Sequence, residues 1–550
     1  MPVTPPLRWS VHPVIAAADW RFLLPMPEGG RFARLVLLGA PDDLQDHITG
    51  ICPADEVTTR LPDDGSASAV VVLPGARVTA LELARATAGG GSVYVQGRWG
   101  ARHPLGGTAR SVAGALSREG LTPTGVYALG MHAGLPSRFV PIDEPGALQW
   151  FLRHLYRPLD VAGWLAASTG TAAAGVAARL LRAVSPQFAV TAVASRARCA
   201  APRALSMIAS RHGPGLATAR PLLLAGGGDR VVALPFPRGH SRPSLVLKLP
   251  RLRALAARTE AEHGRAAALR ASLPAALADA IPRPMELGRT GDDVFSIEEY
   301  VDGRPLLVTS GSWGAPARGR ESDLRDAAEW LERFHLATLR ERRPWGDAET
   351  GEWVEEPFDR FHRALGATDA DRRLRDAALE HARSVHGAML PIVCRHRDYT
   401  VWNVMRSRSG LAVIDWEGAR PGPALCDLLH LATSWHVAVN GMSYPRGEAR
   451  AVRELFLSPR PADPHRTFVD AIVDRYLSRL GMDGRLTPIL LLYHCLELAL
   501  RRIEQLRDHG EAPSDARQVN PARALIQLLA DRRTELLRDR TSPHVAPTSG

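Results

Sequence analysis

Five polar side chains follow one another closely in the stretch 392–417, between short apolar runs: His396, Asp398, Asn403, Asp415 and Glu417. One predicted strand ends at 392–393, a turn lies at 407–410, and a second strand spans 411–414. This arrangement brings two carboxylates and a carboxamide toward one point. Such a set can orient and deprotonate a hydroxyl group and can hold Mg2+ against nucleotide phosphates, so the spacing predicts phosphoryl-transfer chemistry.

A single lysine stands out among the basic residues. Of the 68 lysines and arginines in the chain, only Lys248 is a lysine. A compact ammonium group and a planar guanidinium are not interchangeable at every site. Lys248 lies in a predicted strand over 245–249, where an ammonium group can meet nucleotide phosphates; chance alone can also retain one lysine.

Other features of this region could complete a nucleotide site. A glycine turn interrupts the predicted strands at Gly226, Gly227 and Gly228. Such a turn lets backbone approach phosphates, although a hairpin needs no such function. A predicted helix over 252–273 carries Glu262 on an otherwise apolar stripe. Glu262 is either a partner for Lys248 or an edge residue that reaches solvent. Glu260 is the second candidate for the partner of Lys248.

A predicted strand over 295–300 (FSIEEY) leads into a tight turn at 301–306. Backbone groups at such a connection between two lobes can hydrogen-bond a nucleobase. We therefore place Glu299 among the predicted nucleotide-binding residues.

The order of these features is that of a kinase-like fold: lysine on a strand, glutamate on the next helix, a lobe connection, a catalytic loop and a metal segment. The chain from about 205 to 535 resembles the aminoglycoside phosphotransferase and choline kinase family. HRDYTVWN matches the family's His-x-Asp-x4-Asn loop, and IDWEGARPGPALCDLLHLA matches its Asp-x-Glu segment and a downstream aspartate, Asp427. The resemblance implies an α+β bilobal protein-kinase-like domain over 205–540.

The resemblance also implies the chemistry of the catalytic loop. Asp398 would be the catalytic base or hydroxyl-orienting carboxylate, and Asn403 and Asp415 would hold Mg2+. Glu417 would join the metal shell directly or through water. The implied reaction is ATP-dependent phosphorylation of a hydroxyl group on a small molecule, such as a sugar, an aminoglycoside-like compound or an amino alcohol.

Supporting roles follow from the same resemblance. Lys248 and Glu262 would position the phosphates of ATP. His396 would hold the loop through a hydrogen bond to backbone or to Asp427, and Asp427 would act as a helix cap and loop brace.

Two departures from the family pattern bear on the acceptor. Arg397 stands where the small-molecule branch usually has glycine. An arginine at this position is a feature of protein kinases. However, only eleven residues separate Asp415 from Asp427, and no Ala-Pro-Glu motif follows. This gap leaves no room for an activation segment, so we expect a small-molecule acceptor rather than a protein.

The acceptor is expected between the catalytic loop and two C-terminal helices, 468–480 and 488–506. Four charged residues fall near that face: Glu497, Arg501, Arg502 and Glu504. The sequence does not decide whether they meet an acceptor or solvent, and a solvated face is the simpler interpretation. Their mixed charge does not indicate a polycationic acceptor, which would need a strongly acidic pocket.

Residues 1–200 alternate between predicted strands and helices, which indicates a parallel α/β sheet. The order of its segments resembles the second half of a class I methyltransferase domain. The first strand departs from that family, because it ends LGAPDD with a single glycine, Gly39, and no acidic residue is clearly placed for ribose hydroxyls. We therefore expect a methyltransferase-like α/β domain without its cofactor.

Composition disfavours several other classes. Five scattered cysteines without CxxC spacing argue against a zinc site or a disulfide framework and favour the cytoplasm. The net charge of +10 is spread without an aromatic-rich basic cluster, so we expect no nucleic-acid partner. The window 161–178 is too weakly apolar for a membrane span, and we expect a small-residue helix packed closely on a neighbour.

The chain begins without the apolar core of a signal peptide, and the tail 541–550 is expected to be disordered. Two other interpretations stay open. One is a non-catalytic kinase-like binding or scaffold module, against which the complete Lys, Glu, Asp, Asn and Asp set argues. The other is a methyltransferase with a regulatory kinase-like domain, against which the Gly39 loop argues.

Overall fold

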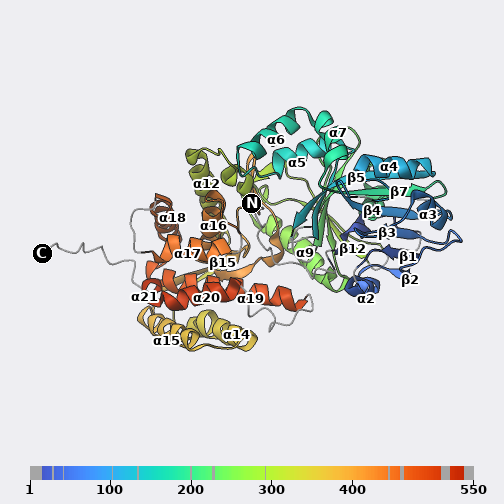
Figure 1. Cartoon of the computed structure of the whole chain (residues 1–550). Coiled ribbons are helices and arrows are strands. Elements are labelled where there is room, and N and C mark those ends of the chain that lie inside the picture. The colour runs from blue at the N-terminus through green and yellow to red at the C-terminus, as the bar shows by residue number, and fades with distance from the viewer. Residues whose placement is uncertain are drawn as a thin grey trace. The chain divides into compact units, whose positions relative to one another are not determined.

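The computed structural model describes residues 15, 17–27, 30–40, 42–101, 103–132, 135–197, 201–225, 230–290, 293–443, 446–458, 464–508 and 521–537. These residues form two compact units, both drawn in Figure 1. The first unit contains the described residues up to 264 and 283–301, and the second contains 265–282 and those from 302 onward. The predicted glycine turn (Gly226, Gly227 and Gly228) and the tail 541–550 lie outside the described residues.

The first unit is built on one twelve-stranded sheet. Four strands at one end lie side by side and parallel: β2 (Ala54–Thr58), β1 (Phe32–Leu38), β3 (Ala69–Val72) and β4 (Ser92–Arg98). Every residue of β3 is buried, as expected for a parallel strand whose two faces are both covered. Helix α2 (Asp42–Ile51) connects β1 to β2, α3 (Ala80–Ala86) connects β3 to β4, and α4 (Ala109–Arg118) follows β4. This arrangement confirms the predicted α/β fold.

The sheet continues with antiparallel strands, so it is mixed as a whole. β7 (Gln187–Ala194) lies between β4 and β5 (Leu121–His132) and runs antiparallel to both. β5 forms a hairpin with β6 (Leu135–Pro141). The chain then passes through α5 (Pro145–His154) and two further helices before β7, which lets β7 enter the sheet in the opposite direction.

The small-residue window 161–178 is not the one closely packed helix that the sequence predicts. It belongs to two helices, α6 (Val161–Ala172) and α7 (Ala174–Val184), bent by 119° at their break. Trp164 in α6 and Leu180 in α7 are exposed, because the run of small residues offers too little apolar surface to bury both helices. Within the described part of the chain, no single helix has the length and apolarity of a membrane span.

Five antiparallel strands complete the same sheet: β8 (Arg220–Leu224), β9 (Arg230–Phe236), β10 (Val246–Pro250), β12 (Asp293–Glu298) and β11 (Pro284–Thr290). β8 follows α8 (Arg203–His212) and pairs with β6, where Phe139 lies opposite Leu223. Leu247 of β10 shares one hydrophobic core with Tyr94 of β4. The predicted boundary near residue 200 therefore falls inside a continuous unit, and it stays a prediction.

The second unit is mostly helical, around one large apolar core. Its long helices are α12 (Ala317–Ala337), α14 (Glu356–Leu365), α15 (Asp369–Ser384), α16 (Leu425–Val439), α18 (Pro464–Leu480), α19 (Thr487–Asp508) and α20 (Pro521–Asp531). Figure 1 shows α19 and α20 side by side, with α14 and α15 packed against them. Two three-stranded sheets carry the site: β13 (Gly303–Pro305) with β16 (Val404–Ser407) and β17 (Gly410–Val413), and β14 (Glu341–Pro344) with β15 (Met389–Arg395) and β18 (Arg420–Pro423).

The elements that carry the predicted site agree with the sequence analysis. Helix α9 spans Ala256–Ser272 where the sequence predicts a helix over 252–273, and β10 carries Lys248 as predicted. An antiparallel strand group is thus followed by a helical part, in the order of a kinase-like fold. The predicted fold class is confirmed.

Candidate active site

The catalytic loop lies between β15 and the β16–β17 hairpin, as the apolar runs predict. Leu390, Ile392 and Val393 of β15 are buried and fix the start of the loop. The hairpin turns at 408–409 and pairs Val404 with Val413, which brings Asp415 back beside the loop. The backbone N–H of Ile414 donates to the carbonyl oxygen of Asn403 at 2.9 Å. This bond holds Asn403 close to Asp415, the residue after Ile414.

Asn403 orients the carboxylate of Asp398. Its Nδ2 donates to Oδ2 of Asp398 at 2.8 Å and to the Asp398 carbonyl oxygen at 3.0 Å. Asn403 is 8% exposed, whereas 45% of the Asp398 side chain is accessible. A fixed carboxylate with an accessible face can receive a proton from a bound hydroxyl group.

Surrounding protein raises the pKa of the Asp398 carboxyl above its usual value, chiefly by desolvation. Arg501 lowers this pKa, and the nearby carboxylate of Asp415 raises it. The carboxyl is therefore more basic than that of an ordinary aspartate.

His396 is a structural part of the loop. Its Nδ1 accepts the backbone N–H of Asp398 at 3.2 Å, and its Nε2 lies 2.9 Å from the carbonyl oxygen of Ile414. With Nδ1 as the acceptor of a backbone N–H, Nε2 is the ring nitrogen that can donate. The ring also packs against Trp416 at a centroid distance of 4.5 Å. His396 thus links the catalytic loop to the metal segment.

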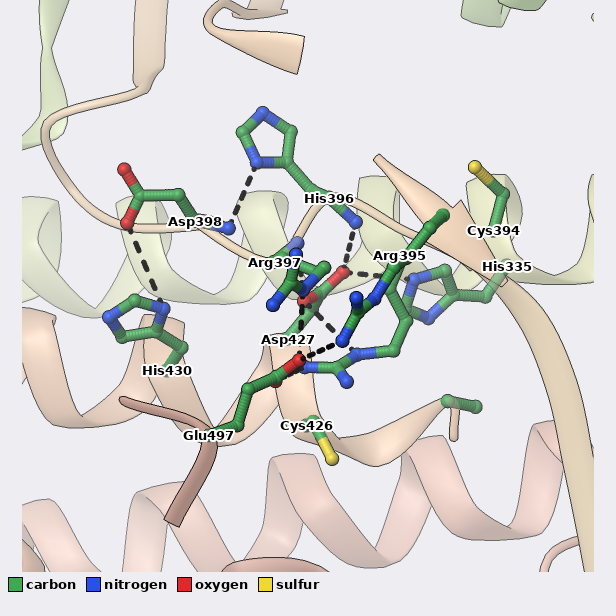
Figure 2. Close-up of polar contacts among 12 residues, drawn as sticks. His335, Cys394, Arg395, His396, Arg397, Asp398, Cys426, Asp427, His430 and Glu497 are labelled. Atoms are coloured by element: carbon green, nitrogen blue, oxygen red, sulfur yellow. Dashed lines mark hydrogen bonds and ion pairs between the residues drawn. The ribbon is translucent and has the colours of Figure 1, made fainter. Parts of the chain in front are cut away.

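Asp427, at the start of α16, anchors the backbone of the catalytic loop. Its two carboxylate oxygens accept the backbone N–H groups of His396 at 2.6 Å and Arg397 at 2.9 Å. Figure 2 shows this carboxylate between the loop backbone, His335 and Arg395. Burial would raise the pKa of Asp427, but His335, whose Nε2 lies 3.5 Å from Oδ2, and the charge of Arg395 outweigh it and hold the pKa well below the usual range.

Arg397 adopts a left-handed backbone conformation with φ +70°. The family's usual glycine enters this region without strain, whereas a residue with a Cβ does not. Here the bond to Asp427 and an ion pair from Arg397 Nε to Glu497 Oε1 at 2.8 Å hold the residue in place. The departure from glycine is therefore compensated by two contacts outside the loop.

Glu497 of α19 corrects the interpretation of the acceptor face as solvated. It is 4% exposed and lies among three arginines, with Arg395 Nη2 at 2.7 Å and Arg420 Nη2 at 3.3 Å in addition to Arg397. Burial would raise its pKa, but Arg395, Arg397 and Arg501 together hold the pKa well below the usual value. Figure 2 shows Glu497 beside Arg395 and Arg397, so it supports the loop rather than meeting solvent.

The other predicted residues of that face divide in two. Arg502 is also buried and pairs with Glu448, while Glu504 pairs with Arg360 at the surface. A solvated face is thus correct for Glu504 and wrong for Arg502. The reason is that α19 packs between α16 and α20, which buries more than one side of the helix.

His430 of α16 was not predicted from the sequence. Its Nδ1 lies 4.0 Å from Oδ1 of Asp398, and the ring packs on His494 at 5.1 Å. Burial, with His494 and Arg501, holds the pKa of His430 well below its usual value, so the ring is neutral. It therefore contacts the Asp398 carboxylate without neutralising it.

Asp415 and Glu417 provide carboxylates close to Asn403. Asp415 has φ +73° and is half-buried, Glu417 is exposed, and one oxygen of each lies within 4.8 Å of the other. Carboxylate and carboxamide oxygens are the ligands that Mg2+ prefers. The donor set fits the predicted metal.

In the first unit, Lys248 lies between two carboxylates. Its Nζ is 2.5 Å from Glu262 Oε1, the pairing considered in the sequence analysis, and 2.5 Å from Glu298 Oε1. Arg230 also pairs with Glu262, and all three side chains around Lys248 are buried or nearly so. Glu262, Ala266 and Leu273 are buried along the predicted stripe of α9.

Glu298, which precedes the predicted nucleotide-binding residue Glu299, faces Lys248. Glu299 is exposed, and its backbone N–H donates to the carbonyl oxygen of Arg283 at 2.9 Å. The alternation in FSIE could have indicated this, because Phe295 and Ile297 enter the core while Ser296 and Glu298 share the opposite face. The second candidate partner, Glu260, pairs instead with Arg289.

Residues 225–461 match the phosphotransferase enzyme family. The match confirms the family resemblance predicted for the C-terminal part of the chain. No curated protein matches the chain.

Several solved structures are similar to half or more of the chain. A microcompartment-associated aminopropanol kinase is 16% identical, with 60% of this chain and 98% of that chain covered and a TM-score of 0.39. The macrolide 2'-phosphotransferase MphH from Brachybacterium faecium is 17% identical, with 58% and 96% covered and a TM-score of 0.37. A type VIII aminoglycoside-3'-phosphotransferase is 17% identical, with 50% and 97% covered and a TM-score of 0.29.

Proposed function

We propose that the protein transfers the γ-phosphoryl group of ATP to a hydroxyl group of a small molecule, with Mg2+. The observation that carries this proposal is the accessible Asp398 carboxylate, oriented by Asn403 within a loop that Asp427 clamps. Most of the catalytic power in phosphoryl transfer comes from positioning and electrostatics. A rigid carboxylate beside two metal-ligand candidates meets that need.

Each residue has a defined task in this proposal. Asp398 accepts the hydroxyl proton as the oxygen attacks phosphorus. Asn403 fixes Asp398 through Nδ2, which leaves its carboxamide oxygen for Mg2+ together with Asp415 and Glu417. Bound Mg2+ neutralises charge on the phosphates. Lys248, held by Glu262 and Glu298, supplies a positive charge to the nucleotide.

A small-molecule acceptor fits the short chain between the metal segment and α16. After Asp415 come one helical turn at 416–418 and β18, and α16 begins at Leu425. This leaves no segment that could form a platform for a protein substrate. The positive charge of Arg501, which acts on the Asp398 carboxyl, also disfavours a polycationic acceptor.

Nucleotide binding tests the proposal. Calorimetry with a non-hydrolysable ATP analogue and Mg2+ is expected to give one site in the wild type. Asp415→Ala should abolish the Mg2+-dependent part of the affinity, while Asp398→Asn keeps binding and loses transfer. Absence of any nucleotide affinity in the presence of Mg2+ would refute the proposal.

For residues 1–200 we propose a methyltransferase-like domain without its cofactor. Ligands of such sheets bind in the crevice beyond the carboxyl ends of the parallel strands. A Cβ on Gly39, at the end of β1, would meet the Leu73 carbonyl oxygen at 2.9 Å and the Ala76 nitrogen at 3.0 Å. The backbone after β3 thus packs directly on this position, which supports a closed crevice. Binding of S-adenosylmethionine to the full chain would overturn this proposal.

A further inference from the structure

Helices α6 and α7 carry a large share of the exposed apolar surface. Thirteen large apolar side chains are exposed in the described part of the chain, and six of them lie in these two helices. The three of α6 lie at positions i, i+3 and i+4, and the three of α7 at i, i+4 and i+8, so each set falls on one side of its helix. We call these six residues the outer face. They are Val161, Trp164, Leu165, Val176, Leu180 and Val184, each 45–59% exposed.

The inner sides of the two helices carry small residues instead. Gly170 of α6 is buried, and a Cβ there would meet Cδ1 of Leu152 in α5 at 2.7 Å. Ala178 of α7 is buried in the core that contains Trp150 of α5. Figure 1 shows both helices on the outside of the first unit, beside α5.

This arrangement inverts the pattern of an ordinary surface helix. A helix on the surface of a globular protein turns its large apolar side chains inward and its polar side chains outward. In α6 and α7 the small residues make the helix contacts and the large apolar residues face outward. Close packing through small residues, with large apolar side chains on the free side, is typical of helices that contact lipid.

The charges of this segment have one sign. Helix α6 contains no charged residue, and α7 contains two arginines and no acidic residue. The next acidic residue after Asp160 is Asp229, and Asp160 itself caps α6 by accepting a backbone N–H at 2.7 Å. Arg179 is exposed and follows Val176 by three residues, so it borders the outer face. An apolar face with a positive border is complementary to anionic headgroups above acyl chains.

We propose that the outer face of α6 and α7 binds the surface of an anionic lipid bilayer. The helices lie in the interface, with their apolar side chains about 5–10 Å into the boundary between headgroups and acyl chains. Trp164 suits this position, because indole rings prefer the level of the headgroups. The 12 residues of α6 extend about 18 Å, against about 30 Å for the hydrocarbon core, and α7 turns away from it by 119°, so the pair lies on the bilayer rather than crossing it.

A protein partner is the other class of occupant for such a face. A protein interface gains its specificity from paired polar and charged groups at its rim. Helices α6 and α7 offer no acidic side chain for such pairing. A bilayer surface requires only apolar area and positive charge, which are the two properties that these helices combine. The proposal does not depend on phosphoryl transfer, because neither helix carries a residue assigned to that reaction.

Flotation of the full chain with lipid vesicles tests the proposal. The probes are vesicles of phosphatidylcholine alone and vesicles of an equal mixture of phosphatidylcholine and phosphatidylglycerol. The wild type is expected to float with the mixed vesicles and to bind the neutral vesicles more weakly. Added salt should lower the affinity for the mixed vesicles, because it screens the attraction between arginines and anionic headgroups.

Three exposed positions separate the apolar contribution from the electrostatic one. Trp164→Ser and, independently, Leu180→Ser should each lower the partition coefficient about tenfold for both kinds of vesicle, because each removes one inserted apolar side chain. Arg179→Gln should lower it about fivefold, and only for the mixed vesicles. Trp99→Ser is the matched control, because Trp99 is 55% exposed in the same unit but lies outside both helices, and it should leave binding unchanged.

Several outcomes would overturn the proposal. They are a wild type that does not float with the mixed vesicles, equal binding to neutral and mixed vesicles, and equal losses in Trp99→Ser and Trp164→Ser. If Trp164→Ser does not fold, Leu180→Ser decides, and wild-type affinity in that variant also overturns the proposal. Light scattering of the free protein tests the protein alternative: a wild-type dimer that Leu180→Ser dissociates would assign the outer face to a second copy of the chain.

Discussion

The left-handed backbone of Arg397 gives a sharp test of how the catalytic loop is held. A residue with a Cβ pays about 1–2 kcal/mol in this conformation, whereas glycine pays none. Replacing Arg397 by alanine or by glycine removes the same guanidinium and the same ion pair with Glu497. The two variants therefore differ mainly in backbone cost.

The magnitudes follow from the contacts. Loss of the charge-assisted bond from Arg397 to Glu497 costs about 1.5–3 kcal/mol, at the modest end for a buried pair because Arg395 still holds Glu497 at 2.7 Å. Glycine recovers the left-handed cost but loses about 0.5–1 kcal/mol through the greater freedom of its unfolded chain. Arg397→Gly should therefore be more stable than Arg397→Ala by about 0.5–1 kcal/mol.

Equilibrium urea unfolding of the wild type and both variants measures this difference. The expected order is wild type, then glycine, then alanine, which reverses the usual ranking of alanine above glycine. A glycine variant that is no more stable than the alanine variant would refute the left-handed conformation and the strain assigned to it.

Three further predictions concern the site. Glu262→Gln should weaken nucleotide binding about tenfold, since it removes one of the carboxylates that hold Lys248, whereas Glu260→Gln should not; titration calorimetry decides, and equal effects would contradict the assignment. The kcat/KM value should fall as pH falls through the raised pKa of Asp398, because only the carboxylate accepts the proton; a flat acid limb in the wild type would contradict this role. Asp427→Asn should lose about 1.5–3 kcal/mol of unfolding free energy at neutral pH, measured by urea unfolding. Because the pKa of Asp427 is depressed in the folded protein, the difference from wild type should shrink as the pH falls below the ordinary pKa of an aspartate. A pH-independent difference would count against the clamp.

The catalytic loop was predictable because its chemistry is local. Asp398, Asn403 and Asp415 lie within one loop and one hairpin, so turn residues and apolar runs determine their arrangement. Lys248 was conspicuous as the single lysine, and the stripe of α9 indicated Glu262 as its partner.

The supporting contacts were not predictable in the same way, because they join residues far apart in the sequence. Glu497 lies about a hundred residues after the loop that it stabilises, and α19 buries it through packing that no local period reveals. Glu298 was not predicted as a partner of Lys248, although strand alternation decides which glutamate faces that lysine.

The central claim is transfer of phosphate to a small-molecule hydroxyl group. Phosphorus NMR of the protein with ATP, Mg2+ and a panel of sugars, amino alcohols and aminoglycosides tests it most directly. We expect a new phosphomonoester signal with at least one acceptor, and we expect it to be absent from Asp398→Asn although that variant still binds nucleotide. Nucleotide binding without transfer to any hydroxyl acceptor, or equal transfer by Asp398→Asn, would contradict it.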